Sequence, residues 1–414
     1  MWHESMKIAI LVHKLTQGGT QRQALSLGRE LIKNGHAVTV YAAVYTPEVF
    51  APELTKGIPI HALRIVTPGQ KEKPGRPFAW LNRPRILVAF LRERSASRAL
   101  ADLIDPATEI LNPHAHGYMA AYFFKRRVRD VPSVWMMNDM PLSSWALWKE
   151  RQLGETQKRT ILSRVLLAAV DLLKRKYIAA QQVIAVLDDI NRGYVRAYLD
   201  RDAVVVRSGL DGERFSCFPH EAPLNTDVRL LLVGIFEPHR RFEDAVAALR
   251  LLRERGMGAT LSVIGNPNAN PSYYKKILAQ IAEAGCKDYV VLKGGVSESE
   301  LVEAYRTHHI FLFPNDIQTW GLAVFEAMAM GMPVIVSRGC GAHEVLTDRI
   351  NALLVEPQQP TEIADAVEEL VADHSLYDAL RNEGRRFVES SISWQRYADR
   401  MSALFTAAVA HRET

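Results

Sequence analysis

One apolar stretch of the chain, residues 315–337 (NDIQTWGLAVFEAMAMGMPVIVS), carries two polar residues whose types and spacing can do chemistry. Gln318 precedes Glu326 by eight positions. The segment LAVFEAMAM predicts a helix that ends at Gly331, a residue suited to a helix C-terminus. A carboxylate about one turn into this helix can accept two hydroxyl hydrogen bonds, which a vicinal diol such as that of ribose offers. An equal alternative is a surface residue favoured by the helix dipole.

The start of that helix has the chemistry of an anion site. Trp320 and Gly321 allow a ligand to approach the backbone closely, because glycine has no Cβ. The amides of residues 321–324 point out of the helix end, where negative charge is favoured. Arg240 and Arg241, in VGIFEPHRRFEDAV, stand at the start of another predicted helix. Cations there oppose the helix dipole unless an anion binds, and a plain exposed basic helix start is the alternative.

Two histidines follow one another closely in ILNPHAHGYMAAYFF. His114 and His116 are two residues apart, so a strand places them on the same side. Gly117 favours the close approach of a ligand. Each histidine can instead be a packed interior residue that holds a backbone carbonyl, and this alternative is stronger for His114. Asp188 and Asp189, in VLDDI, resemble a metal-binding acidic pair, but their place after a strand favours a helix N-cap.

Short apolar runs alternate with longer amphipathic segments, which is typical of parallel sheets covered by helices on both faces. We therefore expect an α/β protein with two Rossmann-like, doubly wound parallel-sheet domains, separated by the turn-rich segment from residue 207. SESELVEAY opens one helix with a capping box, Ser297 with Glu300. The predicted strands lie within residues 7–13, 37–43, 58–65, 109–115, 133–139, 182–188 and 202–208, and then 229–236, 259–265, 289–295, 309–315, 332–337 and 351–356.

Ligands of such sheets bind beyond the carboxyl ends of the strands. Two domains of this kind that face each other form a cleft, and residues at the strand ends should line it. That rule selects Gly18, Gly19, His114, His116, Asn138, Asp139, residues 234–241, Gly265, residues 314–321 and residues 339–341.

The composition is that of a globular protein with more than one domain. The chain has 414 residues, of which 48% are hydrophobic and 23% charged, and this length exceeds one ordinary core. Cys217, Cys286 and Cys340 have no metal-ligand spacing and form no even-numbered framework, so we expect a reducing compartment, the cytoplasm. No apolar run reaches the length of a membrane span, and the amino terminus predicts a strand from Lys7 rather than a signal peptide.

The net charge of +5 conceals an asymmetry. Residues 1–205 hold 30 Lys and Arg against 18 Asp and Glu, a charge of +12, whereas the remainder holds 21 against 28, a charge of −7. Basic segments with embedded aromatic residues favour peripheral contact with an anionic membrane, such as the inner face of the cell membrane. A solvated basic face, or affinity for an acidic soluble molecule, is an equal alternative. Nucleic acid fits less well, because no binding motif is present.

The segment EAMAMGMPVIV resembles the signature of retaining family-4 glycosyltransferases of the GT-B class, the glycosyl transferases group 1. In that signature a Glu and seven further residues precede a second Glu, which is Glu326 here. The segments GGTQRQALSLGRELIKNGHAVTVY, VRSGLDGERF, LVEAYRTHHIFLFPN, SRGCGAHEVL and SWQRYADRMSALF resemble other family motifs, in the family's order. The resemblance implies an acceptor-binding domain over residues 1–206, a nucleotide-sugar-binding domain over residues 207–390, and a C-terminal helix over residues 391–414 that crosses back to the first domain.

The resemblance also implies the reaction. It is a retaining, metal-independent transfer of a sugar from a UDP- or GDP-sugar to a hydroxyl of a glycan, a lipid-linked molecule or a small molecule, with no cofactor and no metal site. The implied donor contacts are Gly19, Gly234, Arg240, Arg241, Gln318, Thr319, Trp320, Gly321, Leu322 and Glu326. The implied acceptor contacts are Gly18, His114, Asn138 and Asp139, and the implied catalytic residues are His116, Arg240 and Gln318.

Two positions depart from the family pattern. Gln318 stands for the first Glu, which keeps hydrogen bonding but loses a charge, and Ile235 stands for an expected Arg. Arg240 occupies the family's Lys position, so we expect it to be the main diphosphate contact, with Arg241 as a replacement for the lost charge. A catalytically impaired sugar-nucleotide-binding module and a nucleotide-sugar 2-epimerase stay open as alternatives. A nicotinamide-dependent dehydrogenase fits poorly, because no G-x-G-x-x-G closes the first strand.

Overall fold

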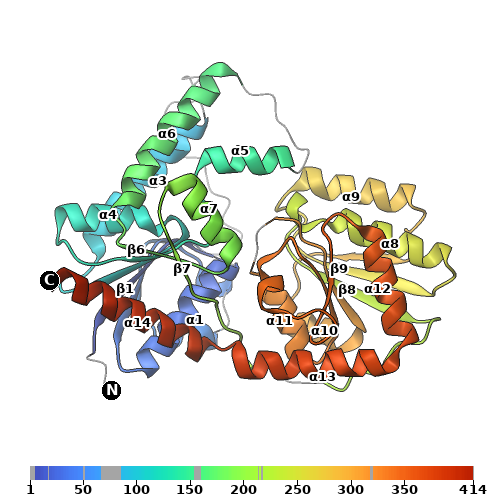
Figure 1. Ribbon diagram of the computed structural model, residues 1–414. Helices are drawn as coiled ribbons and strands as arrows, with labels where there is room; N and C mark the ends of the chain where they lie inside the picture. The colour runs from blue at the N-terminus through green and yellow to red at the C-terminus, as the bar shows by residue number, and fades with distance from the viewer. Residues whose placement is uncertain are drawn as a thin grey trace. The chain divides into compact units, whose positions relative to one another are not determined.

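The computed structural model describes residues 5–16, 18–49, 52–66, 85–152, 160–212, 214–215, 218–317 and 320–413. The chain forms two compact units (Figure 1): the first unit is Met1–Gly209 with Trp394–Thr414, and the second unit is Leu210–Ser393. The boundaries predicted from the sequence lie after residues 206 and 390. Gln318 and Thr319, two of the predicted donor contacts, lie outside the described residues.

The sheet of the first unit has seven strands in the order β3-β2-β1-β4-β5-β6-β7. They are β1 (Lys7–Leu15), β2 (Ala37–Tyr45), β3 (Ile60–Ile65), β4 (Ile110–His114), β5 (Val134–Met136), β6 (Val183–Val186) and β7 (Val204–Val205). Neighbouring strands pair in parallel, so that Ile8 of β1 lies between Val38 of β2 and Ile110 of β4. This order is that of a Rossmann fold, and its topological switch point lies between β1 and β4.

Alternate strand residues of the first unit pack on opposite faces of the sheet. Ile10 of β1 lies in one cluster with Tyr397 and Met401 of α14, whereas the next residue, Leu11, lies in the cluster formed with Tyr118 of α4. Figure 1 shows α14 beside α1 on the first of these faces. The helices are α1 (Gly19–Lys33), α2 (Pro52–Thr55), α3 (Arg85–Leu103), α4 (Tyr118–Arg127), α5 (Ser143–Gln152), α6 (Ile161–Ala179), α7 (Asp189–Leu199) and α14 (Trp394–Glu413), with 3-10 turns η1 (Pro47–Val49) and η2 (Ala115–Gly117).

The sheet of the second unit has six parallel strands in the order β10-β9-β8-β11-β12-β13, which repeats the Rossmann order. The strands are β8 (Val228–Val233), β9 (Ala259–Ile264), β10 (Val290–Lys293), β11 (Ile310–Phe313), β12 (Val334–Ser337) and β13 (Leu353–Val355). The helices are α8 (Phe242–Glu254), α9 (Pro271–Glu283), α10 (Glu298–Thr307), α11 (Leu322–Ala329), α12 (Pro360–Ala372) and α13 (His374–Ser391), with 3-10 turns η3 (Pro238–Arg240) and η4 (Gly341–Val345).

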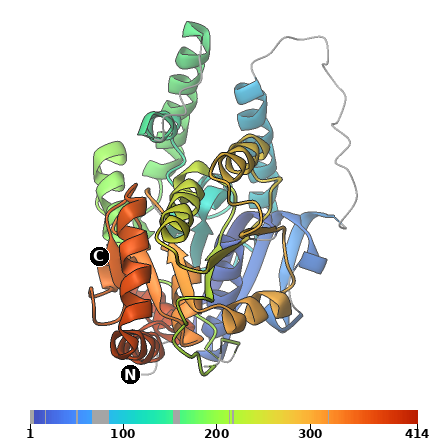
Figure 2. The same ribbon diagram turned by 90° about the vertical axis from the view of Figure 1, so that its right-hand side faces the viewer.

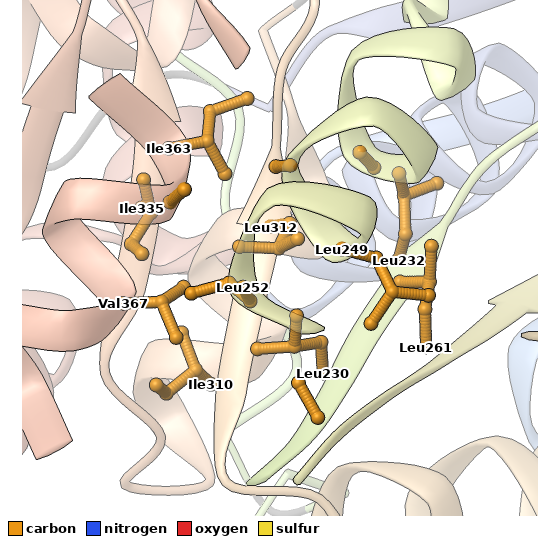
Figure 3. Close-up of a cluster of buried hydrophobic side chains, with 14 of the residues drawn as sticks. Leu230, Leu232, Leu249, Leu252, Leu261, Ile310, Leu312, Ile335, Ile363 and Val367 are labelled. Carbon is orange, nitrogen blue, oxygen red and sulfur yellow. The ribbon is translucent and has the colours of Figure 1, made fainter. Parts of the chain in front are cut away.

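The main core of the second unit lies between its sheet and helices α8 and α12 (Figure 3). Ile310 and Leu312 of β11 belong to this core, together with Leu252 of α8. Because side chains alternate along a strand, Phe311 and Phe313 of β11 point to the opposite face. The aromatic residues on that face position the site described below.

The sequence predictions of local structure are confirmed at several points. Each predicted strand segment overlaps one of the strands β1 to β13 that the described residues form. Asp188 is an N-cap, whose side chain accepts a hydrogen bond from the N–H of Asn191 at 2.7 Å. Ser297 and Glu300 form the predicted capping box, and Gly331 follows α11 with a φ of 80°. None of the described helices has both the length and the apolar composition required to cross a membrane.

Candidate functional site

In the second unit, the loops that follow several strands meet at the carboxyl edge of the sheet. Asp316, after β11, donates its backbone N–H to the carbonyl oxygen of His239, in the loop after β8, at 3.0 Å. A Cβ on Gly265, after β9, would lie 1.9 Å from the carbonyl oxygen of Gly234. A Cβ on Gly339, after β12, would lie 2.4 Å from the carbonyl oxygen of Asp316. These glycines therefore permit four loops to pack together at the edge where ligands of such sheets bind.

Glu326 of α11 is a buried carboxylate, 8% exposed. The hydroxyl of Tyr305, from α10, donates to its Oε2 atom at 2.9 Å, and the tyrosine is itself fully buried. The alternative that Glu326 is a surface residue is therefore wrong. A buried carboxylate needs hydrogen-bond donors, and Tyr305 supplies one of them. Tyr305 was not predicted from the sequence, although a tyrosine within LVEAYRTHHIFLFPN indicates a hydroxyl that needs a partner when it is buried.

Gly321 forms the N-cap of α11 in the left-handed region, with a φ of 78°. A Cβ at this position would lie 2.9 Å from the ring of Phe313, so the position requires glycine on both counts. Leu322 begins the helix directly after it. Trp320 packs inward, 3% exposed, with its ring 4.8 Å from that of Phe325. The backbone around Gly321 and Leu322 is thus the part of this segment suited to a ligand, whereas the Trp320 side chain serves the core.

Arg240 and Arg241 differ in what surrounds them. The Arg240 guanidinium lies over the ring of Phe313, 5.8 Å from its centroid, and its stem passes Gly234, where a Cβ would be 3.6 Å away. Arg241 makes a bidentate ion pair with Asp244, with N···O distances of 2.8 and 2.9 Å, and a further pair with Glu243 at 3.2 Å. Burial alone would lower the pKa of Arg241, but these carboxylates outweigh it and raise the pKa. The charge of Arg241 is therefore compensated within the fold, by the carboxylates of Asp244 and Glu243.

In the first unit, the two histidines of the HAH segment do not share a side, contrary to the prediction. The strand ends at His114, and the backbone turns at Ala115, whose φ of 45° lies in the left-handed region. His114 is fully buried and bonds through Nε2 to Asn112 Oδ1 at 2.9 Å, and burial lowers its pKa to about 3. We therefore do not retain His114 as an acceptor contact. The His116 side chain, in contrast, is 41% exposed.

The turn before His116 is fixed by its neighbours. Asn138, after β5, accepts the N–H of Ala115 at 3.2 Å, and the indole of Trp135 donates to the Ala115 carbonyl oxygen at 2.8 Å. Asn138 also donates to Gln23 of α1. A Cβ on Gly117 would lie 2.3 Å from the carbonyl oxygen of Leu11, so this turn approaches β1 as closely as glycine allows. Asn138 therefore orients the turn that carries His116, a role that the sequence did not indicate.

The other predicted residues of the first unit lie at its surface. Gly18 and Gly19 precede and begin α1, and both are exposed. Gly19 has open space where a Cβ would be, whereas a Cβ on Gly18 would meet the flexible Gln21 side chain. Asp139, next to Asn138, is exposed. These positions are accessible to a ligand, as the predicted donor contact Gly19 and the predicted acceptor contacts Gly18 and Asp139 require.

Two family models match this chain in succession. The model described as Glycosyltransferase Family 4 matches residues 17–214, and the model described as Glycosyl transferases group 1 matches residues 214–387. The chain belongs to the family-4 glycosyltransferases. The resemblance stated from the sequence motifs is confirmed, and with it the enzyme class.

Named relatives and a solved structure agree with this assignment. The glycosyltransferase is 26% identical over 410 residues to a D-inositol 3-phosphate glycosyltransferase of Xylanimonas cellulosilytica, covering 95% of this chain and 93% of the relative. It is 28% identical over 209 residues to a GDP-mannose-dependent alpha-(1-6)-phosphatidylinositol monomannoside mannosyltransferase of Mycobacterium tuberculosis, covering 47% of this chain and 53% of the relative. Its fold is similar to that of HepE of Anabaena in complex with UDP and glucose, with a TM-score of 0.68, 13% identity and coverage of 97% and 100%. The predicted fold class, GT-B with two Rossmann-like domains, is confirmed.

The site of the glycosyltransferase combines three groups suited to a nucleotide. They are a buried carboxylate that accepts hydrogen bonds, a cation stacked on an aromatic ring, and the amino end of α11 beside the same ring. Within the described residues, no group of three or more His, Cys, Asp or Glu side chains is placed to hold a metal ion.

Proposed function

We propose that this glycosyltransferase moves a sugar from a nucleoside diphosphate sugar to a hydroxyl acceptor, with retention of configuration and without a metal ion. The acceptor oxygen forms a bond to the anomeric carbon as the bond from that carbon to the diphosphate oxygen breaks. The acceptor proton ends on the departing diphosphate. The departing group gains negative charge, so the reaction needs cationic or N–H groups at the diphosphate.

The observation that carries this proposal is the arrangement of Arg240, Gly321 and Glu326 around Phe313 and α11. Arg240 lies over the Phe313 ring, and Gly321 begins α11 against the same ring. An arginine and the amino end of a helix at one ring form an anion site. Glu326 lies in the first turns of that helix, suited to the two ribose hydroxyls of the same nucleotide. The ligand chemistry that satisfies all three groups is that of a nucleoside diphosphate.

The relatives support the donor class. One relative is named as GDP-mannose-dependent, and the structural neighbour was solved with UDP and glucose. We therefore propose a UDP- or GDP-sugar as donor and a glycan, lipid-linked or small-molecule acceptor. The cytoplasm, where such donors are made, is the proposed location.

A panel of nucleotide sugars, including UDP-glucose and GDP-mannose, tests the donor proposal. We expect one of them to raise the melting temperature of the protein. The effect should vanish in Glu326→Ala, because two hydrogen bonds to a charged group contribute about 1.5–3 kcal/mol each. Glu254→Ala, an exposed carboxylate on α8, is the matched control and should keep the full effect. A Glu326→Ala variant that binds the nucleotide as tightly as the wild type would show that the ribose assignment is wrong.

Product analysis tests the reaction itself. Release of nucleoside diphosphate in the presence of an acceptor identifies a transferase, whereas binding without release indicates an impaired module. The anomeric coupling of the product, measured by NMR, decides between retention and inversion. Turnover that persists in excess EDTA supports metal independence, and turnover restored by added Mg²⁺ or Mn²⁺ contradicts it.

We also propose that helix α6 brings the first unit to an anionic membrane. Figures 1 and 2 show the amino end of α6 extending away from the rest of the first unit. Ile161, Val165 and Leu172 share one exposed side of this helix, and Ile161 and Leu172 are 81% and 71% exposed. Exposed cations flank them at Arg164, Arg175 and Lys176.

The one acidic residue of α6 does not weaken this charge pattern. Asp171 is buried and accepts the N–H groups of Ser143 and Ser144, at the start of α5, at 2.7 and 2.9 Å. The exposed side of α6 therefore combines apolar residues with cations, the chemistry of a helix that lies in a membrane interface. This face suits a lipid-linked acceptor.

Sedimentation with vesicles tests the membrane proposal. We expect binding to phosphatidylcholine vesicles that contain phosphatidylglycerol and weak binding to phosphatidylcholine alone, because each nearby cation adds about 1 kcal/mol. Leu172→Gln and Arg175→Glu should each reduce binding. Leu278→Gln, an exposed leucine of the second unit, is the control. Equal binding by Leu172→Gln and wild type would contradict the proposal.

A further inference from the structure

Glu93 is a largely buried acidic residue of the first unit that the proposed transfer does not use. It lies in the middle of α3, with a side chain that is 17% exposed. In the sequence it stands in LRERSASR, between two arginines, where a solvated position would be the ordinary expectation. Burial of a carboxylate without compensating partners is costly, so its surroundings need an explanation.

The partner of Glu93 is the histidine at the predicted reaction centre. Its Oε1 atom makes a short hydrogen bond with Nδ1 of His116. His13 of β1 and Lys174 of α6 also act on the carboxylate through their charges. Lys174 in turn donates from Nζ to the carbonyl oxygen of Pro141 at 2.7 Å. Three basic groups from three elements therefore surround one carboxylate.

These groups keep Glu93 ionised. Burial, the largest influence, would raise the pKa of Glu93, but the hydrogen bond and charge of His116, with the charges of His13 and Lys174, outweigh it and hold the pKa below its ordinary value. An ionised carboxylate can only accept hydrogen bonds. The hydrogen atom between the two side chains therefore belongs to Nδ1 of His116, which leaves Nε2 as the nitrogen available to another group.

The backbone that carries the His116 side chain is held in place as well. The left-handed turn at Ala115 is held on both sides, by Asn138 at its N–H and by Trp135 at its carbonyl. A residue other than glycine in that region persists only when its surroundings hold it there. The turn sets the position of the His116 backbone, and Glu93 sets the direction of the ring. The contacts of Ala115 and the contact of Glu93 are independent of each other, and both restrain the partly exposed imidazole of His116.

We infer that Glu93 is a positioning residue, which fixes the orientation and the tautomer of His116 so that Nε2 faces the bound substrate. The inference rests on the proposed function, together with the prediction from the family motifs that His116 is a catalytic residue. It assigns a function to a residue on α3, an element from which no site residue was predicted. Removal of the carboxylate behind a metal-bound histidine typically changes affinity or activity by about 10- to 100-fold, and we expect an effect of the same order for Glu93.

The tautomer test does not depend on activity. Long-range proton–nitrogen spectra of the histidine rings, assigned with His116→Ala, report which nitrogen carries the hydrogen. At about pH 8.5, where an ordinary histidine is neutral, we expect hydrogen on Nδ1 of His116 in the wild type. We expect the Nε2-protonated form to appear in Glu93→Met, which has similar volume and no acceptor. Asp102→Asn, near the carboxyl end of α3, is the matched control and should leave the pattern unchanged.

The kinetic test uses the donor that the panel identifies. Glu93→Met should lower kcat about 10- to 100-fold while changing KM for the nucleotide sugar less than about 2-fold. Glu93→Gln, which keeps an acceptor oxygen, should recover most of the loss. In a His116→Ala background, Glu93→Met should have no further effect, because the residue acts through His116.

The outcomes separate this inference from the proposed function. A wild-type tautomer pattern that survives in Glu93→Met overturns the inference, as does an equal loss of kcat from Glu93→Met with and without His116. If no nucleotide sugar is turned over, the proposed function fails, and the spectra still decide whether Glu93 positions the ring. If Glu93→Met fails to fold, Glu93→Gln replaces it in the tautomer test and in the kinetic test, with a smaller expected effect in each.

Discussion

The sheets of the two units share a strand order, but the loops at the corresponding position carry different chemical groups. Both sheets place the loop after the first strand next to the loop after the fourth, and both sites lie there. In the second unit this position holds an arginine and the start of a helix, which attract negative charge. In the first unit it holds His116, a ring fixed by a carboxylate and an anchored turn. A fold therefore specifies where a site lies, and the loops specify what it does.

Net charge alone would place the anion site in the wrong unit. Residues 1–205 carry +12, and the rest of the chain carries −7, yet the proposed diphosphate site lies in the second unit. Charges farther away than about 8 Å are largely screened at physiological ionic strength, so contacts near the ligand decide. Arg240 lies over the Phe313 ring, 5.8 Å from its centroid, and Arg241 is paired with the carboxylates of Asp244 and Glu243. The basic surplus of the first unit is available to a different partner.

The largest expected effect in this comparison comes from Arg240→Ala. Loss of a charged hydrogen-bond donor removes about 1.5–3 kcal/mol, so we expect nucleotide affinity to fall roughly 10- to 100-fold. Isothermal titration calorimetry with the nucleoside diphosphate measures this change. Arg250→Ala, an exposed arginine of α8 paired with Glu254, is the control. If both variants bind the nucleotide equally well, the anion site does not lie at Arg240.

The fold was predictable from the sequence because its signals are local and repeated. Continuous apolar runs marked the parallel strands, and the caps at Asp188 and Ser297 were visible in the sequence itself. The side to which His116 points was predicted incorrectly, because alternation along a strand stops where the strand ends at His114. No local pattern indicates such an end when the following residue, Ala115, adopts a left-handed conformation that alanine rarely takes.

The residues that support the sites were beyond prediction for a related reason. Glu93 precedes His116 by more than twenty residues, and Tyr305 precedes Glu326 by a similar interval. Such pairs are created by the packing of one helix on a neighbouring element, and a single sequence carries no record of it. Once the structure shows that such a tyrosine or carboxylate is buried, it must have a hydrogen-bond partner, and this requirement identifies the pair.

A smaller effect concerns how the stability of the first unit depends on pH. Burial lowers the pKa of His114 to about 3, so the unfolded chain binds a proton that the folded first unit excludes. The unfolded state thus holds more protons between about pH 3 and pH 6.5, and stability falls as pH falls through that range. Between about pH 7 and pH 5 this histidine should reduce the free energy of unfolding by about 2 kcal/mol.

His114→Gln removes that titration and keeps a side chain able to bond Asn112. We expect the variant to lose about 2 kcal/mol less stability than the wild type on acidification over this range, measured by urea denaturation at both pH values. His61→Gln, an exposed histidine of β3, should behave like the wild type. Nucleotide affinity should be unchanged in both, since neither residue is a predicted donor contact. An identical pH dependence in His114→Gln would mean that His114 is protonated in the folded protein.

The smallest effect, and the sharpest comparison, comes from Tyr305→Phe. This change removes the hydroxyl that donates to Glu326 and leaves the buried ring in place. Tyr377→Phe is matched to it, because that buried hydroxyl donates to the carbonyl oxygen of His309, also at 2.9 Å, on α13 of the same unit. Each variant should lose about 1 kcal/mol of stability, the usual contribution of one hydrogen bond.

Nucleotide affinity should separate these two tyrosines. Tyr305 holds the Glu326 carboxylate in the orientation that accepts hydroxyls, so Tyr305→Phe should weaken binding about 2- to 5-fold, below 1 kcal/mol. Tyr377→Phe should leave binding unchanged, because its hydroxyl supports only the fold. Calorimetric titration of both variants with the same nucleoside diphosphate measures the difference. If both weaken binding equally, Tyr305 acts through stability alone. If neither does, the carboxylate keeps its orientation without the tyrosine, and the packing of α11 is sufficient to set it.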